Sequence, residues 1–71
     1  MCESKVYLDV NGKREKIADE AVIVKEEGSG VVVVGLIGEH QKIENARLVE
    51  VDARKHMVIL KRISNDEGIQ D

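Results

Sequence analysis

The chain has 71 residues, a net charge of −3 at pH 7 and a single aromatic side chain, Tyr7. This length allows one small domain, which buries only about 60% of its extended-chain surface and is marginally stable as a monomer. A single cysteine excludes an internal disulfide. The apolar runs fall far short of the roughly 20 residues that cross a bilayer, and charged residues interrupt the start of the chain. We therefore expect a cytoplasmic protein, with no membrane attachment, that gains stability by self-association.

Alternating side chains predict the first strands. From residue 5 to residue 10 every second residue is apolar, which is typical of a strand with one buried face. Asn11-Gly12 follows and is a strong hairpin signal, so residues 13–17 are expected to return as a polar strand. A further strand is predicted at residues 21–27, and it ends in a tight turn at residues 28–30.

The second half of the chain continues the strand pattern. Residues 31–37 are apolar throughout, so this strand is expected to be covered on both faces, and Gly35 within it suggests a bulge or sharp bend. Two more strands are predicted at residues 45–52 and 56–62. Short strands at close spacing, with no amphipathic helix, predict an all-β fold, a small SH3-like or OB-like barrel of five to seven short antiparallel strands. The barrel is expected to occupy residues 1–62 as a single domain, followed by a flexible polar C-terminal tail at residues 63–71.

Apolar residues outnumber the core positions of so small a barrel. One set is expected to fill the core: Val6, Leu8, Val10, Val22, Val24, Val32, Val34, Leu36, Leu48, Val51, Val58 and Leu60. A second set then lies on the opposite faces of the same strands: Ile23, Val31, Val33, Val49, Met57 and Ile59. If exposed, the second set forms a patch that soluble monomers rarely carry, so we predict a homodimer that buries part of it.

The familiar catalytic patterns do not occur in the sequence. There is no Walker motif, no G-x-G-x-x-G and no H-E-x-x-H, and the serines stand in no recognisable triad context. Gly28-Ser29-Gly30 joins two predicted strands and is read as a turn. His40 and His56 fit solvated positions in a loop and at a strand start. Because a small barrel leaves little room for a substrate pocket of about 300 Å³, we expect a protein that is not an enzyme.

The one thiol stands at position 2, where the first nitrogens of the chain are also potential donors. If Met1 is retained, its backbone amine, the Cys2 amide nitrogen and the Cys2 thiolate close two fused five-membered chelate rings. If Met1 is removed, the Cys2 amine and thiolate close one ring. Such donors suit square-planar Ni(II) or Cu(II) better than tetrahedral zinc, and nickel avoids the redox chemistry of copper with a thiolate. Two N-termini at the two-fold axis of a homodimer can complete the site, whereas the alternatives are an intermolecular disulfide or a packed, inert cysteine.

Three stretches give the chain a family resemblance: MCESKVYL at the start, LIGEHQKIENARLVEVD in the middle and HMVIL near the end. In these stretches it resembles the CooT family of small nickel-binding proteins, whose most specific element is the cysteine at position 2. The resemblance implies an SH3-like homodimer that holds Ni(II) at its interface through Cys2 and the neighbouring backbone nitrogens. It also implies a role near the maturation of a nickel enzyme, carbon monoxide dehydrogenase, in storage, delivery or sensing of the metal.

Basic side chains leave a second function open. Lys13, Arg14 and Lys16 lie on one predicted strand, and Arg54 and Lys55 lie in a turn. The same family has been labelled as RNA-binding, but small barrels bind RNA with stacking aromatic residues in a basic groove. One tyrosine and a net negative charge argue against that use. An RNA- or protein-binding module that uses the basic patches remains the alternative, beside a purely structural subunit.

Overall fold

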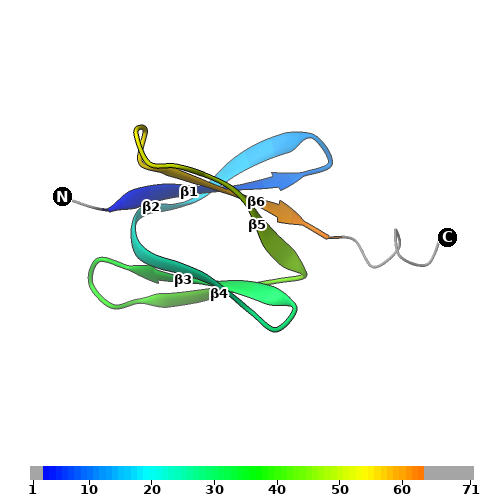
Figure 1. The fold of residues 1–71 in the computed structure, drawn as a ribbon. Helices are drawn as coiled ribbons and strands as arrows, with labels where there is room; N and C mark the ends of the chain where they lie inside the picture. Colours follow the sequence, from blue (N-terminus) through cyan, green and yellow to red (C-terminus); the bar gives the residue numbers. More distant parts are fainter. Residues whose placement is uncertain (1–2, 64–71) are drawn as a thin grey trace, which may run out of the picture.

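The computed structural model describes residues 3–63, and within this range it contains six strands and no helix. The strands are β1 (Ser4–Val10), β2 (Lys13–Glu27), β3 (Gly30–Gly35), β4 (His40–Glu44), β5 (Ala46–Asp52) and β6 (Met57–Arg62). The prediction of an all-β fold with five to seven strands is confirmed (Figure 1). The predicted metal ligands Met1 and Cys2, and residues 64–71 of the predicted tail, lie outside the described range. The division into a domain and a flexible tail stays a prediction.

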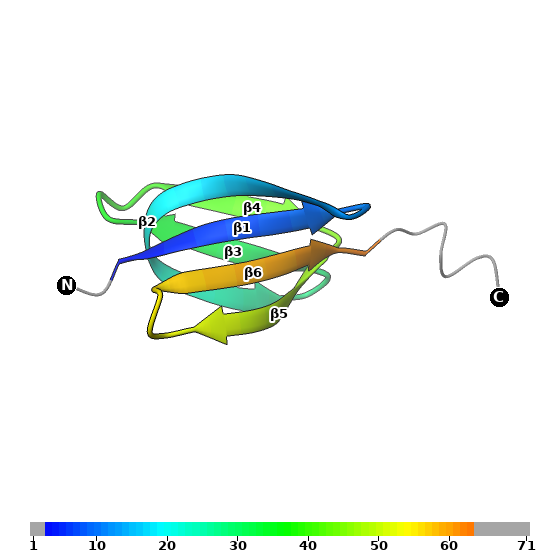
Figure 2. The same cartoon turned by 90° about the horizontal axis from the view of Figure 1, so that it is seen from above.

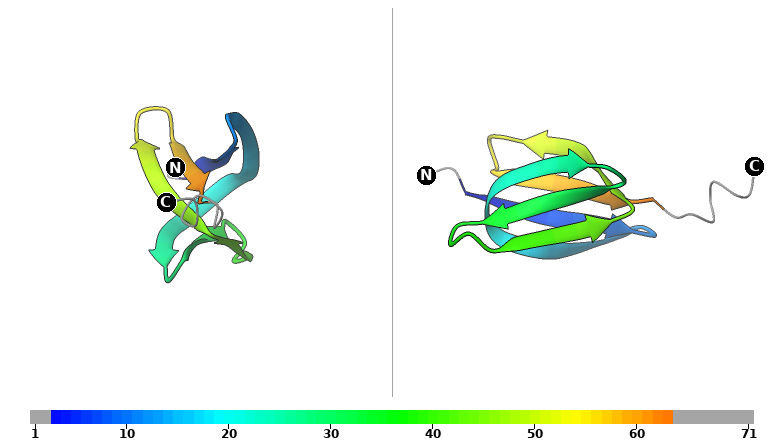
Figure 3. Two further views of the ribbon diagram at one scale, coloured as in Figure 1. Left: turned by 90° about the vertical axis from the view of Figure 1, so that its right-hand side faces the viewer. Right: turned by 90° about the horizontal axis from the view of Figure 1, so that it is seen from below.

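All six strands form one sheet in the order β4-β3-β2-β1-β6-β5. The sheet curls into a half-barrel in which β1, β6 and β5 face β3 and β4, consistent with the predicted SH3-like barrel (Figure 3, left). Neighbouring strands are antiparallel except β1 and β6, which run parallel in register. The prediction of antiparallel strands is therefore wrong for this pair. The pairing joins the first and last strands of the barrel, and no local sequence pattern reports on it.

β2 replaces two strands that the sequence predicts separately, and with 15 residues it is not short. Its first half pairs with β1 and its second half with β3. The register slips between Ser4 and Tyr7 on the β1 side, and between Ala21 and Ile23 on the β3 side. Such irregularities bend a strand, so β2 passes continuously from one half of the barrel to the other (Figure 2).

Two tight turns form where the sequence predicts them. Asn11 has a φ of 52° and Gly12 a φ of 84°, as both central residues of a type I′ turn require. The hairpin of β2 and β3 turns through Gly28 and Ser29, with Gly28 at a φ of 63°. Both hairpin predictions are confirmed.

The core lies inside the curl of the sheet. It consists of Val6, Leu8, Ala21, Val31, Val33, Ile43, Ala46, Val58 and Leu60. In β3 the predicted alternation is reversed, because Val31 and Val33 are buried whereas Val32 and Val34 are only partly buried. Four consecutive valines carry no alternation from which the inward face can be read.

Three further residues expected in the core lie largely in solvent. Val22 is 47% exposed, Leu36 48% and Val51 59%. Of the set expected on the opposite faces, Ile23 (48%) and Val49 (53%) are exposed as predicted, and Ile59 is buried. The exposed aliphatic surface therefore exists, but of the predicted set only Ile23 and Val49 belong to it.

The predicted strand at residues 31–37 ends early, at Gly35. A tight turn follows, in which the Gly35 amide donates to the Glu39 carbonyl oxygen at 2.8 Å and the Gly38 amide donates to that of Gly35 at 3.0 Å. The irregularity expected at Gly35 lies on its partner strand, since Ala21 pairs with Gly35 and the register then slips before Ile23. Leu36 and Ile37 consequently belong to a loop.

Candidate functional site

The structure gathers one strand start and two turns at the end of the barrel from which β1 begins, here called the chain-start end. Ser4 pairs with Ala21, at the bend of β2, and Ala21 pairs in turn with Gly35, where the β3–β4 turn begins. On the other side Lys5 pairs with Met57, which follows the β5–β6 turn. Figure 2 shows the first described residues and both turns at this end.

β1 is anchored at the chain-start end by the β5–β6 turn. The Lys5 amide donates to the His56 carbonyl oxygen at 2.9 Å. His56 has a φ of 55°, and the Lys55 amide donates to an Asp52 carboxylate oxygen at 3.1 Å, which closes the turn. This backbone pairing places residue 3, and hence the attachment point of Cys2, beside β6 and its turn.

A hollow of about 200 Å³, here called the chain-start groove, opens beside Ser4. It is lined by Ser4, Ala21, Val22, Val24, Leu48, Val51 and Val58. All of these except Ser4 are aliphatic, and Val22 and Val51 are about half exposed. At the same end the β3–β4 loop exposes Ile37 by 88%. The greatest exposure of aliphatic side chains therefore lies close to the point where the chain enters the barrel.

Glu3 is a residue that the sequence analysis did not single out. Its Oε1 atom is buried and has no hydrogen-bond partner among the described residues. Buried carboxylate oxygens are normally paired, so a donor or cation from outside residues 3–63 is expected at this position. The signal in the sequence is the acidic side chain next to the only thiol.

The predicted ligands Met1 and Cys2 lie outside the described residues, so their geometry stays a prediction. Residues 3–63 contain no group of three histidine, cysteine, aspartate or glutamate side chains able to hold a metal ion. His40 is exposed, with Nδ1 at 3.0 Å from the Gly38 carbonyl oxygen, and His56 is exposed in its turn. A site of three such ligands within one chain would therefore need a donor from outside residues 3–63.

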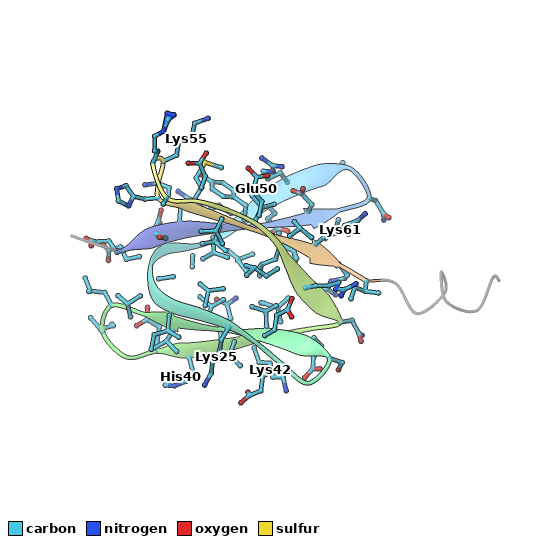
Figure 4. The ribbon with its side chains drawn as sticks, viewed as in Figure 1. Lys25, His40, Lys42, Glu50, Lys55 and Lys61 are labelled. Atoms are coloured by element: carbon cyan, nitrogen blue, oxygen red, sulfur yellow. The ribbon has the colours of Figure 1, made fainter. Side chains whose placement is uncertain are left out.

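The five predicted basic residues do not form one surface. Lys13 lies at the hairpin of β1 and β2, whereas Arg54 and Lys55 lie in the β5–β6 turn at the chain-start end. Figure 4 shows Lys55 far from Lys61 near the other end of β6. Two of the five are also neutralised, since Arg14 pairs with Asp9 and Lys16 pairs with Asp19. The structure gives no continuous basic groove across these residues.

These ion pairs account for the pKa shifts on this surface. Arg14 donates from Nε and Nη2 to the two Asp9 carboxylate oxygens at 2.8 and 3.1 Å. The hydrogen bond lowers the pKa of Asp9 and raises the pKa of Arg14. In the same way, the hydrogen bond between Lys16 and Asp19 raises the lysine pKa and lowers the aspartate pKa. Arg14, Lys16 and Asp19 are exposed and Asp9 is partly exposed, and such surface pairs contribute little to stability.

Among the described residues no polar or charged residue is buried as a whole, although the Oε1 atom of Glu3 is. The expectation that the barrel lacks room for a pocket is wrong, because two hollows measure about 330 and 320 Å³.

No helix of the described residues is long and apolar enough to cross a membrane.

Comparisons with known proteins give a family match and a shared fold. A family model described as "CO dehydrogenase accessory protein CooT" matches residues 1–61. The crystal structure of a protein assigned as CooT from Carboxydothermus hydrogenoformans superposes with a TM-score of 0.77 at 17% sequence identity. The match covers 89% of this chain and 100% of that one, and it shows a shared fold. The comparison with curated proteins gave no match.

Proposed function

We propose, from the premise that this chain belongs to the CooT family of carbon monoxide dehydrogenase accessory proteins, that it binds nickel as cargo for a nickel enzyme. The proposed protein is a cytoplasmic homodimer that stores, delivers or senses the ion and has no catalytic role of its own. Carbon monoxide dehydrogenase, or a factor that matures it, is the proposed client.

The proposed ligands come from the first two residues. The Cys2 thiolate, the Cys2 amide nitrogen and the Met1 amine form a tridentate set in each chain, which suits square-planar Ni(II). A square-planar ion needs a fourth donor, and a thiolate from a second chain supplies one if the two N-termini meet at a two-fold axis. Residues 3–63 offer no competing cluster of metal ligands.

One observation carries the proposal: the aliphatic chain-start groove opens beside Ser4, two residues after the only thiol. Val22 and Val51 expose about half of their surface there, and water contact with such side chains is unfavourable. A second copy that covers the groove brings another N-terminus to the same place. Self-association and a shared metal site are therefore supported by the same surface.

The unpaired Glu3 oxygen fits this arrangement. Glu3 is next to Cys2 in the chain, and its buried Oε1 atom is left to accept a hydrogen bond from a donor outside residues 3–63. We assign Glu3 no coordination bond.

The test is a nickel titration of the reduced full-length protein, with Cys2→Ser as the variant. A thiolate-to-nickel charge-transfer band that saturates at one metal per dimer is expected for the native chain, and no such band for Cys2→Ser. Because the Met1 amine, the Cys2 amide nitrogen and the Cys2 thiolate must each lose a proton, nickel affinity should fall between pH 8 and pH 6. One thiolate with an ordinary pKa of about 8.5 accounts for roughly a 75-fold fall, and the two nitrogens add to it. A control variant, His40→Ala, removes an exposed imidazole that is not among the proposed ligands and should leave the titration unchanged.

Three results would overturn the proposal. One is a titration without the charge-transfer band, another is equal binding by Cys2→Ser, and the third is an affinity that does not change with pH. Retained RNA affinity in Cys2→Ser, with a steep dependence on salt, would favour the basic-patch alternative instead.

A further inference from the structure

A second uncovered surface lies on the outside of the sheet, away from the chain-start groove. The second half of β2, with β3 and β4, presents its outer face to solvent, and no other described element covers it (Figure 3, right). A hollow of about 320 Å³ lies on this face, lined by Ile23, Lys25, Glu27, Val32, Val34 and His40. It is here called the outer face.

The strand registers arrange the outer face in three rows. Ile23, Val34 and His40 form the first row, Lys25, Val32 and Lys42 the second, and Glu27, Gly30 and Glu44 the third. The face therefore runs from an aliphatic row, through a row with two lysines, to a row with two glutamates. Rows are about 7 Å apart, since each is two residues further along a strand.

Charge and exposure distinguish the middle of this face. Neither Lys25 nor Lys42 forms an ion pair among residues 3–63, in a chain whose net charge is −3. Figure 4 shows both lysines and His40 on the same side of the sheet, pointing away from the barrel. Ile23 beside them is 48% exposed. A fitting occupant therefore carries a negative charge opposite the lysines and an aliphatic side chain one row further on.

The chain itself holds a segment with this chemistry. Residues 64–71 read Ser-Asn-Asp-Glu-Gly-Ile-Gln-Asp and contain three acidic residues, one aliphatic residue and no basic residue. Glu67 and Ile69 are two positions apart, which is the spacing of neighbouring rows when a chain is extended. Asn65 then meets the row of glutamates with a neutral side chain.

The described chain ends at Ile63, close enough to the outer face for residues 64–71 to extend across it. The Ile63 amide donates to the Asn45 carbonyl oxygen, and Asn45 directly follows Glu44 of the third row. Eight extended residues span up to about 26 Å, whereas the three rows span about 14 Å. A segment that leaves Ile63 and turns back along β4 thus meets the glutamate row first and the aliphatic row last.

We propose that residues 64–71 bind reversibly across the outer face of the same chain, with Glu67 between Lys25 and Lys42 and Ile69 in the hollow beside Ile23 and Val34. The predicted flexible tail thereby has a bound state. In that state it covers the aliphatic side chains of the outer face, among them Ile23, which otherwise lie in contact with water. The inference does not depend on the nickel site.

Amide chemical shifts in the full-length protein test this directly. Ile69→Ser is expected to shift the amides of Val32, Val34 and Lys42 and to leave Val6 and Leu60 in the core unchanged. Glu67→Gln should shift the same amides and weaken docking about two- to fivefold, as loss of one exposed ion pair does. Asp66→Asn is the matched control, because it removes an equal charge from the alternate side of the extended segment.

Charge reversal provides the second measurement. Lys42→Glu should release the segment, and Glu67→Lys in the same chain should restore the native shifts. The proposal is overturned if Ile69→Ser moves no outer-face amide, if Asp66→Asn acts as strongly as Glu67→Gln, or if the reversed pair gives no recovery. Shift changes that grow with protein concentration also overturn it, because they would mean docking on a second copy.

Discussion

Replacing Val51 by serine is expected to weaken self-association of this protein about 20- to 400-fold. Val51 lines the chain-start groove and is 59% exposed. Because most of the side chain already lies in solvent, the change leaves the barrel folded while it removes apolar surface that a second copy would cover.

The magnitude follows from the exposed fraction. Complete burial of a valine side chain contributes about 1.5–3 kcal/mol, so covering the exposed part of Val51 contributes about 0.9–1.8 kcal/mol. A two-fold dimer contains the residue twice, which doubles the loss to about 1.8–3.6 kcal/mol. Each 1.4 kcal/mol is a factor of ten in the dissociation constant, which gives the stated range.

Sedimentation equilibrium of the reduced, metal-free protein measures this constant. Val49→Ser is the matched control, because Val49 lies on the same strand and is 53% exposed but does not line the groove. Equal weakening by both variants would refute the assignment of the dimer to the chain-start groove. A native chain that stays monomeric at micromolar concentration would refute the homodimer itself.

Three further variants test the barrel. Leu60 is fully buried, so Leu60→Ala should lower the free energy of unfolding by about 2–5 kcal/mol in urea titrations; a loss below about 1 kcal/mol would contradict the core assignment. At Gly30 a Cβ atom would meet the Ile43 carbonyl oxygen at 2.5 Å and force β3 and β4 apart. Gly30→Ala should therefore lower the free energy of unfolding by about 1–3 kcal/mol. An unchanged urea midpoint would contradict this close approach of the two strands. The lowered pKa of Asp9 means that its ion pair stabilises the fold at pH values above the ordinary carboxyl pKa, and this contribution is lost as the pH falls through the lowered value. In Arg14→Gln the Asp9 pKa should therefore rise, as measured by NMR titration of the carboxyl group. An unchanged Asp9 pKa would contradict the ion pair.

Local patterns in the sequence predicted the local structure well. Asn11-Gly12 specifies its turn because both positions need positive φ, and these two residue types tolerate it. The alternation in β1 identified Val6 and Leu8 as core residues, since polar neighbours mark the outward face. Such signals lie within a few residues and do not depend on what the strand packs against.

The errors arise where the decisive contact is distant in sequence. The inward face of β3 depends on β2 and β4, because its four valines are alike, and the sequence analysis selected the wrong pair. The continuity of β2 depends on two different partner strands, and the parallel pairing of β1 with β6 joins the two ends of the chain. For the candidate site, the thiol was evident from its position, but the groove beside Ser4 required the folded barrel.

If nickel binds to the first two residues and the dimer forms through the chain-start groove, as proposed, the two binding equilibria are coupled. Ordering the chain start to bind a metal costs conformational entropy. In a dimer that already holds both N-termini in place, part of this entropy is lost before the metal binds, so metal binding is more favourable. By linkage, nickel strengthens the dimer by the same factor by which the dimer strengthens nickel binding. A variant such as Val51→Ser, which touches no proposed ligand, therefore weakens nickel binding as well whenever the protein is dilute enough to dissociate. If its nickel affinity in dilute solution equals that of the native chain, the metal site is complete within one chain and the shared site is wrong.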